Sequence, residues 1–131
     1  MTQRADAPDR RDEPASEALE ALVTELDACI DQLRHARDRA GQLFEERQQG
    51  RGWLEIVADE ERPLVVESIS SVMSSLATRG HAWRREQARA LNAEDVSINR
   101  IAALFGVTRQ RISALLRETD AGGPASGAGS G

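Results

Sequence analysis

The side chains best suited to recognise another molecule lie near the C-terminal end of the chain. Within residues 98–117, INRIAALFGVTRQRISALLR, arginine, glutamine and hydroxyl side chains alternate with apolar ones at helical spacing. An arginine guanidinium can donate two hydrogen bonds to guanine, and a glutamine amide can pair with adenine at two points. The chemistry that these residue types allow is recognition of base edges and phosphates.

Two short helices joined by a tight turn would position these side chains. Ser97 can cap a first helix and Thr108 a second, because a hydroxyl oxygen accepts a free N–H group of the first turn. Gly106 lies where the first helix must end, and it can adopt the left-handed conformation of a chain reversal. Val107 is expected to fill the space between the helices. The expected inward positions are Ile98, Ile101, Ala102, Phe105, Ile112, Leu115 and Leu116.

This segment resembles the helix-turn-helix of bacterial repressors, sigma-factor DNA-binding regions and recombinase DNA-binding domains. In that family the fifth position is small, the ninth is glycine, and four further positions are apolar. Counted from Ile98, the matching residues are Ile101, Ala102, Gly106, Val107, Ile112 and Leu115. The string GVTRQRISALL is also similar to small actinobacterial regulators. The resemblance implies a sequence-specific DNA-binding transcription regulator.

The resemblance also implies which residues contact double-stranded DNA. A recognition helix places its N-terminal residues against base edges in the major groove. The first candidates for reading bases are Arg109 and Gln110, followed one turn later by Ser113 and Ala114. Contacts to the phosphate backbone are expected from Thr108, Arg111, Arg117, Asn99 and Arg100. Three earlier residues could extend the basic surface, namely Arg84, Arg85 and Arg89.

The distribution of charge fits such a surface, although the net charge of the chain is −5. Residues 79–117 contain eight Arg and three acidic residues, whereas residues 1–78 contain nine Arg and 17 acidic residues. An acidic body with a basic contact surface is therefore expected. The alternative is an acidic helical adaptor that binds polymerase, a sigma factor or another regulator. A third hypothesis is an architectural or partition-type DNA binder.

A long amphipathic helix is predicted over residues 15–50, with Ser16 as its cap and Gly50 at its end. Steps of three and four residues separate eight apolar or small side chains, namely Leu19, Leu22, Leu26, Cys29, Leu33, Ala36, Ala40 and Leu43. Val23, Ile30 and Phe44 flank this stripe. Such heptads favour a homodimer, and the alternative is packing within the same chain. The half-sites of a dimer on palindromic DNA would lie about 34 Å apart.

Residues 51–93 are predicted to form one or two middle helices in an all-α fold, ahead of the helix-turn-helix region at 94–118. Pro63 would open a helix that continues or restarts after Gly80. Its apolar face would comprise Val65, Val66, Ile69, Val72, Met73 and Leu76. A β-hairpin over residues 53–69 is less favoured, and Trp53 and Trp83 are expected to anchor the core. Residues 1–14 and 119–131 are predicted to be a disordered arm and a flexible tail.

Other functions lack a motif. No nucleophile–base set, phosphate-binding glycine loop or metal-ligand spacing is present, so neither an enzyme nor a cofactor or metal site is expected. Cys29 is the single cysteine and is expected to be a small buried side chain. His35 and His81 are expected to be solvated or packing residues. The chain has no apolar run long enough to cross a bilayer and no signal peptide, which favours the cytoplasm.

Overall fold

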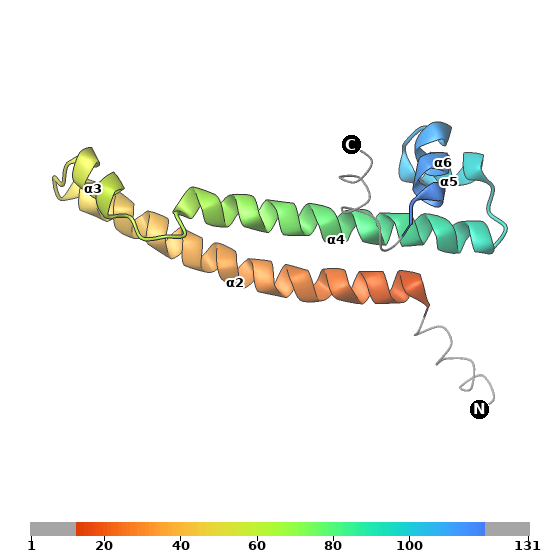
Figure 1. The fold of residues 1–131 in the computed structure, drawn as a ribbon, viewed down its shortest axis with the longest axis horizontal. Helices are drawn as coiled ribbons and strands as arrows, with labels where there is room; N and C mark the ends of the chain where they lie inside the picture. The colour runs from red at the N-terminus through yellow and green to blue at the C-terminus, as the bar shows by residue number, and fades with distance from the viewer. Residues whose placement is uncertain (1–12, 120–131) are drawn as a thin grey trace, which may run out of the picture. The chain divides into compact units, whose positions relative to one another are not determined.

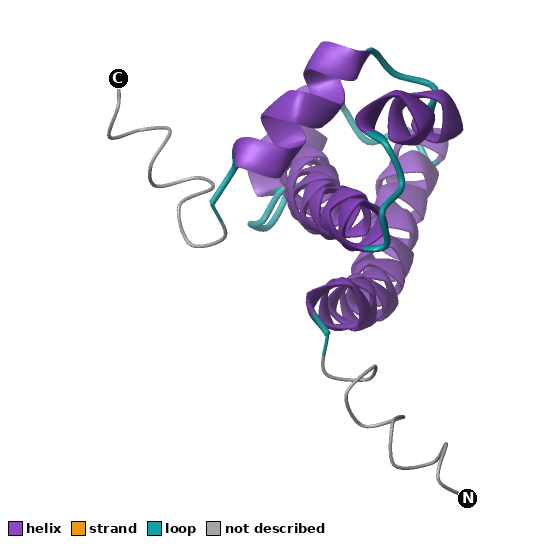
Figure 2. Ribbon diagram, turned by 90° about the vertical axis from the view of Figure 1, so that its right-hand side faces the viewer, coloured by secondary structure: helices purple, strands orange, loops and turns teal. Residues whose placement is uncertain are grey.

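The computed structural model describes residues 13–119, and this part of the chain is all-helical, as predicted (Figures 1 and 2). Its helices are α2 (Pro14–Gln48), α3 (Trp53–Asp59), α4 (Val65–Ala93), α5 (Ile98–Phe105) and α6 (Arg109–Arg117). The hairpin weighed for residues 53–69 does not form, because α3 and the start of α4 occupy that segment. The predicted arm and tail lie outside the described residues, except that Pro14 is already the first residue of α2 and residue 119 is described.

The chain divides into two compact units. Among the described residues, the terminal unit comprises residues 13–21 and 79–119, and it contains the start of α2, the C-terminal part of α4, and all of α5 and α6. The central unit comprises Leu22–Thr78, and it contains most of α2, all of α3 and the start of α4. Each unit is described below by itself.

The beginning of α2 differs from the prediction. Pro14 occupies the first helical position, where a fixed φ and a missing N–H are tolerated. The Glu17 N–H donates to the Glu13 carbonyl at 3.1 Å, so the first turn closes ahead of Ser16. Ser16 is therefore inside the helix and is not its cap.

Three helices end on a residue in the left-handed conformation. These residues are Gly50, Asp95 and Gly106, with φ of 96°, 69° and 71°. After α2, the Arg51 N–H donates across the turn to the Glu46 carbonyl at 3.0 Å. Equivalent hydrogen bonds close the other two helices: the Val96 N–H donates to the Leu91 carbonyl at the end of α4, and the Val107 N–H donates to the Ala102 carbonyl at the end of α5. Each of the three ends therefore has the Schellman geometry, which satisfies the last carbonyl groups of the helix.

The start of α4 lies two residues after Pro63, not at it. Glu67 makes the cap, because its Oε1 accepts the Leu64 N–H at 2.8 Å. That bond, together with the Arg62 guanidinium, lowers the pKa of the Glu67 carboxyl. From Val65 the helix continues through Gly80 without a break.

The core of the central unit uses only part of the predicted stripe. Cys29 and Ala36 of α2 are buried, at 1% and 4% exposure, as are Ile56 of α3 and Val72 of α4, at 2% each. Leu22, seven residues before Cys29, and Leu43, seven residues after Ala36, are half-buried. The other stripe members stay at the surface, namely Leu19, Leu26, Leu33 and Ala40. Every seventh position from Leu22 to Leu43 therefore packs within the chain.

The tryptophan predictions are only partly met. Trp53 is 56% exposed and lies beneath the Arg47 guanidinium, whose carbon is 5.2 Å from the ring centroid. It is not a core anchor, because the inward position of the short helix α3 is taken by Ile56. Trp83 is half-buried.

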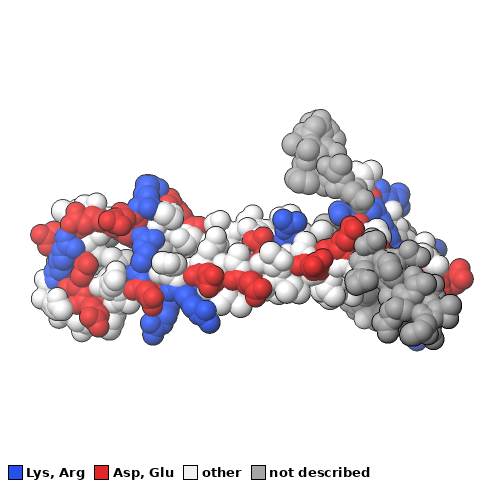
Figure 3. Space-filling view, turned by 90° about the horizontal axis from the view of Figure 1, so that it is seen from below, with Lys and Arg blue, Asp and Glu red and all other residues white. Residues whose placement is uncertain are grey.

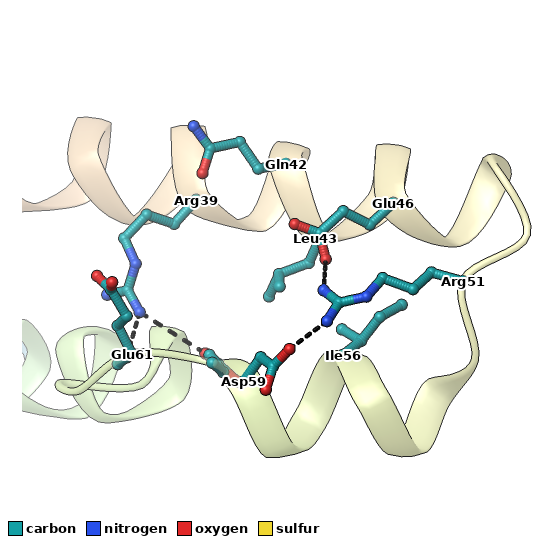
Figure 4. Close-up of a pocket in the computed structure, with 9 residues that line it drawn as sticks. Arg39, Gln42, Leu43, Glu46, Arg51, Ile56, Asp59 and Glu61 are labelled. Atoms are coloured by element: carbon teal, nitrogen blue, oxygen red, sulfur yellow. Dashed lines mark hydrogen bonds and ion pairs between the residues drawn. The ribbon is translucent and has the colours of Figure 1, made fainter.

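Charged side chains fasten α3 to α2 (Figure 4). Arg51 pairs with Glu46 at 2.7 Å and with Asp59, and these hydrogen bonds raise the pKa of the guanidinium. Arg39 donates to the carbonyl oxygens of Glu61 and Pro63. Acidic and basic side chains are correspondingly intermixed around α3 (Figure 3, left).

Candidate nucleic-acid interface

The helices α5 and α6 are fixed at both ends of the turn between them. The Ser97 hydroxyl oxygen accepts the Arg100 N–H at 3.1 Å, and Thr108 Oγ1 accepts the Arg111 N–H at 3.1 Å. Both caps are as predicted. Gly106 makes the reversal, with φ 71° and ψ 33°, so the relative direction of the two helices is set by three local devices.

A small core holds α5 and α6 on α4. Its buried members are Ala88, Ile101, Ala102, Ile112 and Leu115. Leu91, Val96, Ile98, Phe105 and Leu116 pack around it. Each fully buried isoleucine contributes about 1.5–3 kcal/mol of transfer free energy, so this core is the main support of the two helices.

Val107 does not fill the space between the helices as predicted. Its side chain is 41% exposed. The Val107 N–H donates to the Ala102 carbonyl at 3.0 Å, which closes the turn through the backbone. The helices then meet through Ala102 and the two buried isoleucines of the core.

Most of the predicted DNA-contacting residues lie on the surface of α5 and α6. The exposed ones are Asn99, Arg100, Thr108, Arg109, Gln110, Arg111 and Arg117, and the half-buried ones are Ser113 and Ala114. Four of the exposed residues are arginines. Their guanidinium groups form no ion pair with any residue between 13 and 119, so their positive charge is uncompensated there.

Two arginines predicted to extend this surface do not do so. Arg85 is 8% exposed, and its Nε lies 3.2 Å from Glu86 Oε2. Arg89 Nη1 donates to the same oxygen at 2.9 Å. Glu86, itself 7% exposed, pairs with both guanidinium groups, so their positive charge is partly compensated within the unit. Arg84 is exposed, with its guanidinium carbon 4.1 Å from the centroid of the Phe105 ring.

The contact at the C-terminal end of α6 has no counterpart among the predicted contacts. Glu118 is the C-cap residue of α6, and its carboxylate oxygen Oε1 lies 2.8 Å from His81 Nε2. Arg85 Nη1 lies 3.6 Å from the same oxygen. His81 is therefore hydrogen-bonded to Glu118, and this contact joins α4 to the C-terminal end of α6. The two partners are 37 residues apart, so no local spacing indicates their contact.

The cavity drawn in Figure 4 is a poor candidate for a ligand site. It has a volume of about 280 Å³ and lies between α2 and α3 in the central unit. Its two arginines, Arg39 and Arg51, already bind carboxylates and carbonyl groups of the chain. No group of metal-ligating side chains occurs within residues 13–119.

No protein-family model, curated protein or solved structure matches the chain. Of the helices in the described part, none is both long enough and apolar enough to cross a membrane. Functional evidence therefore comes from the residues of α5 and α6 themselves.

Proposed function

We propose that α5 and α6 form a helix-turn-helix that binds double-stranded DNA, and that the chain is a sequence-specific transcription regulator acting as a homodimer. One observation carries the proposal. Arg100, Arg109, Arg111 and Arg117 present unpaired guanidinium groups on two helices whose relative direction is fixed by Ser97, Gly106 and Thr108. Two short helices with a basic exposed surface are the arrangement with which helix-turn-helix proteins read the major groove.

Within this proposal the residues have different roles. Arg109 and Gln110 open α6, so they reach base edges first. Ser113 and Ala114 follow one turn later and are half-buried, which limits them to close contact with base edges or sugar. Asn99, Arg100, Thr108, Arg111 and Arg117 bind phosphates and hold α6 in register.

Selection of bound sequences from random duplex DNA tests the proposal. The purified full chain is expected to enrich a short motif, arranged as a two-fold repeat. Affinity for that motif should fall steeply with salt, because each neutralised phosphate releases counterions. Steep salt dependence without an enriched motif would indicate an architectural binder. The absence of DNA binding at low salt would refute the proposal.

The second candidate function is a protein-interaction adaptor. It is favoured by the exposed apolar side chains of the central unit, among them Ile30 and Met73 at 45% and 66% exposure. An adaptor would bind transcription-machinery proteins through apolar contacts, and such binding changes little with salt. The two functions are therefore separated by the same salt titration.

A further inference from the structure

The central unit carries apolar side chains on its surface as well as in its core. Eleven large apolar side chains between residues 22 and 78 are 40% to 84% exposed. The two aromatic side chains measure about 150–250 Å² each and the aliphatic ones less, so together the eleven leave somewhat under about 1,000 Å² of apolar surface in water. The largest apolar patch of an ordinary monomer is about 300–600 Å². The exposed apolar area of the central unit is larger than such a patch, which indicates that another molecule covers this surface when the protein functions.

The exposed side chains have a constant position relative to the buried ones. On α2, Leu26 precedes the buried Cys29 by three residues and Ile30 follows it by one. The same spacing occurs on the other two helices, as Ile69 and Met73 around Val72, and as Trp53 and Val57 around Ile56. At about 100° per residue, both offsets turn a side chain by roughly 60–100° in the same sense.

These side chains therefore share one side of the helix pair. Within the central unit, α3 and the start of α4 run antiparallel to α2 (Figures 1 and 4). In antiparallel helices, side chains turned in the same sense from the buried seam lie on the same side. The opposite flank agrees with this geometry, because residues turned the other way, including Gln32, Ser68 and Ser71, line one shared groove whose residues are nearly all of polar types.

We define the apolar face by its residues, which are Val23, Leu26, Ile30, Leu33, Phe44, Trp53, Val57, Val66, Ile69 and Met73. We propose that it packs against the apolar face of a second copy of this chain, with the two α2 helices antiparallel across a two-fold axis. The proposal rests on the homodimer of the proposed function and gives that dimer its interface.

The spacing of the apolar side chains on α2 favours a helix with the same spacing as its partner. Steps of three, four and three residues join Val23, Leu26, Ile30 and Leu33, which is the seam with which helices pair. A two-fold axis presents the same seam from the second copy, so the contact is self-complementary. Without Leu54, which lies outside the face, the exposed apolar area is still close to the roughly 800 Å² per partner that stable interfaces bury.

Charges within and beside the face select the antiparallel orientation. Arg37 follows the buried Ala36 by one residue, so it lies within the face at the heptad position of Ile30, and Asp27 lies beside the face, one turn before Ile30. An antiparallel copy of α2 centred between Ile30 and Leu33 brings each Asp27 opposite the Arg37 of the other copy. Both side chains are available, since Asp27 pairs with no residue between 13 and 119. The pair of Arg37 with its neighbour Asp38, at 3.5 Å, is exposed to water.

Light scattering on the full chain tests the interface. At tens of micromolar the wild-type protein is expected to have twice the chain mass of 14.3 kDa. The variant Ile30→Glu/Met73→Glu is expected to be monomeric, because the dimer would bury four unpaired carboxylates. The control Gln32→Glu/Ser71→Glu adds the same charges to the polar groove and is expected to stay dimeric. Circular dichroism checks that both variants remain helical.

A charge exchange tests the orientation. Arg37→Glu and Asp27→Arg are each expected to weaken dimerisation about three- to tenfold, and the combined variant to restore it. A monomeric wild-type protein, or a dimeric Ile30→Glu/Met73→Glu variant, would refute the interface. Weakening without restoration would refute the antiparallel pairing of α2.

Failure of the interface and failure of the proposed function give different results. A wild-type dimer that does not bind DNA would overturn the proposed function and support the interface. A wild-type monomer that enriches a DNA motif would overturn the interface and support DNA binding.

Discussion

His81 Nε2 lies 2.8 Å from the Oε1 atom of Glu118, and this contact ties α4 to the residue that ends α6. Arg85 approaches the same carboxylate at 3.6 Å. The N-terminal end of α6 is set by Thr108 and the turn, whereas its C-terminal end is held by these polar contacts. The direction of the proposed recognition helix thus depends on residues outside the proposed DNA-contacting set.

Glu118→Ala is expected to lower the free energy of unfolding by about 1 kcal/mol, because His81 and Arg85 lose their shared acceptor. Urea unfolding followed by circular dichroism measures the change. Glu45→Ala removes an exposed carboxylate from α2 and serves as the control. Equal unfolding midpoints for the two variants would show that the contact contributes nothing.

Arg109→Ala is expected to weaken binding to the selected DNA motif by about 1–3 kcal/mol and to relax the base preference at one position. The reason is the loss of a two-point contact at the start of α6. Fluorescence anisotropy with motif and scrambled duplexes measures both effects. Arg34→Ala, an exposed arginine of the central unit, removes the same charge and is the matched control. If both variants bind the motif equally well, Arg109 does not read bases.

Ile112→Ala is expected to cost about 2–5 kcal/mol of stability, since Ile112 is fully buried between α6 and the rest of its unit. Leu104→Ala is the comparison, because Leu104 is 57% exposed on α5. That change should stay within about 0.5 kcal/mol. Thermal unfolding compares the two variants, and a similar loss for both would contradict the assigned core.

Glycine substitutions at two positions are expected to have opposite signs. Gly106→Ala places a Cβ at φ 71° and should cost about 1 kcal/mol. Gly80→Ala lies inside α4 with no atom within 4 Å of the added Cβ, and it should stabilise by about 0.5–1 kcal/mol. Chemical denaturation gives both values. Destabilisation at both positions would show that α4 is not a regular helix at Gly80.

The Glu67 cap predicts a pH dependence. The Leu64 N–H and the Arg62 guanidinium lower the pKa of Glu67 from its usual 4.5. A carboxyl with a lowered folded pKa stabilises fully above 4.5, and this contribution is lost as the pH falls through the lower value. Glu67→Gln should therefore lose stability at pH 7 and depend less on pH between about 5 and 3. Melting curves across that range, with Glu45→Gln alongside, measure the difference.

The positions of α5 and α6 could be predicted accurately from the sequence because the ends of these helices are encoded locally. Ser97, Gly106 and Thr108 each act on backbone groups within a few residues, so side-chain type and spacing are sufficient. The same reasoning failed at Ser16, where Pro14 and Glu13 close the first turn earlier. An N-cap can be recognised from sequence, but neighbouring candidates compete for it.

Contacts between distant residues were not predictable from spacing. Arg85 looks like a surface arginine beside Arg84, yet Glu86 and Glu118 surround it. Tryptophan is a residue type often found in protein cores, but the seven-residue helix α3 has only one buried side chain, Ile56, and Trp53 is not that residue. The heptad stripe of α2 likewise could not show which of its members the chain itself would cover.

The reactivity of Cys29 can report how often the helices of the central unit separate. The thiol is 1% exposed and donates to Glu25, and burial together with that carboxylate raises its pKa. A thiol reagent can reach it only when the helices that bury it separate, and the chain has no second cysteine to compete. The rate of alkylation therefore measures how often the helix pair opens. Because a bound second copy would hold the pair closed, that rate should fall as the protein concentration rises.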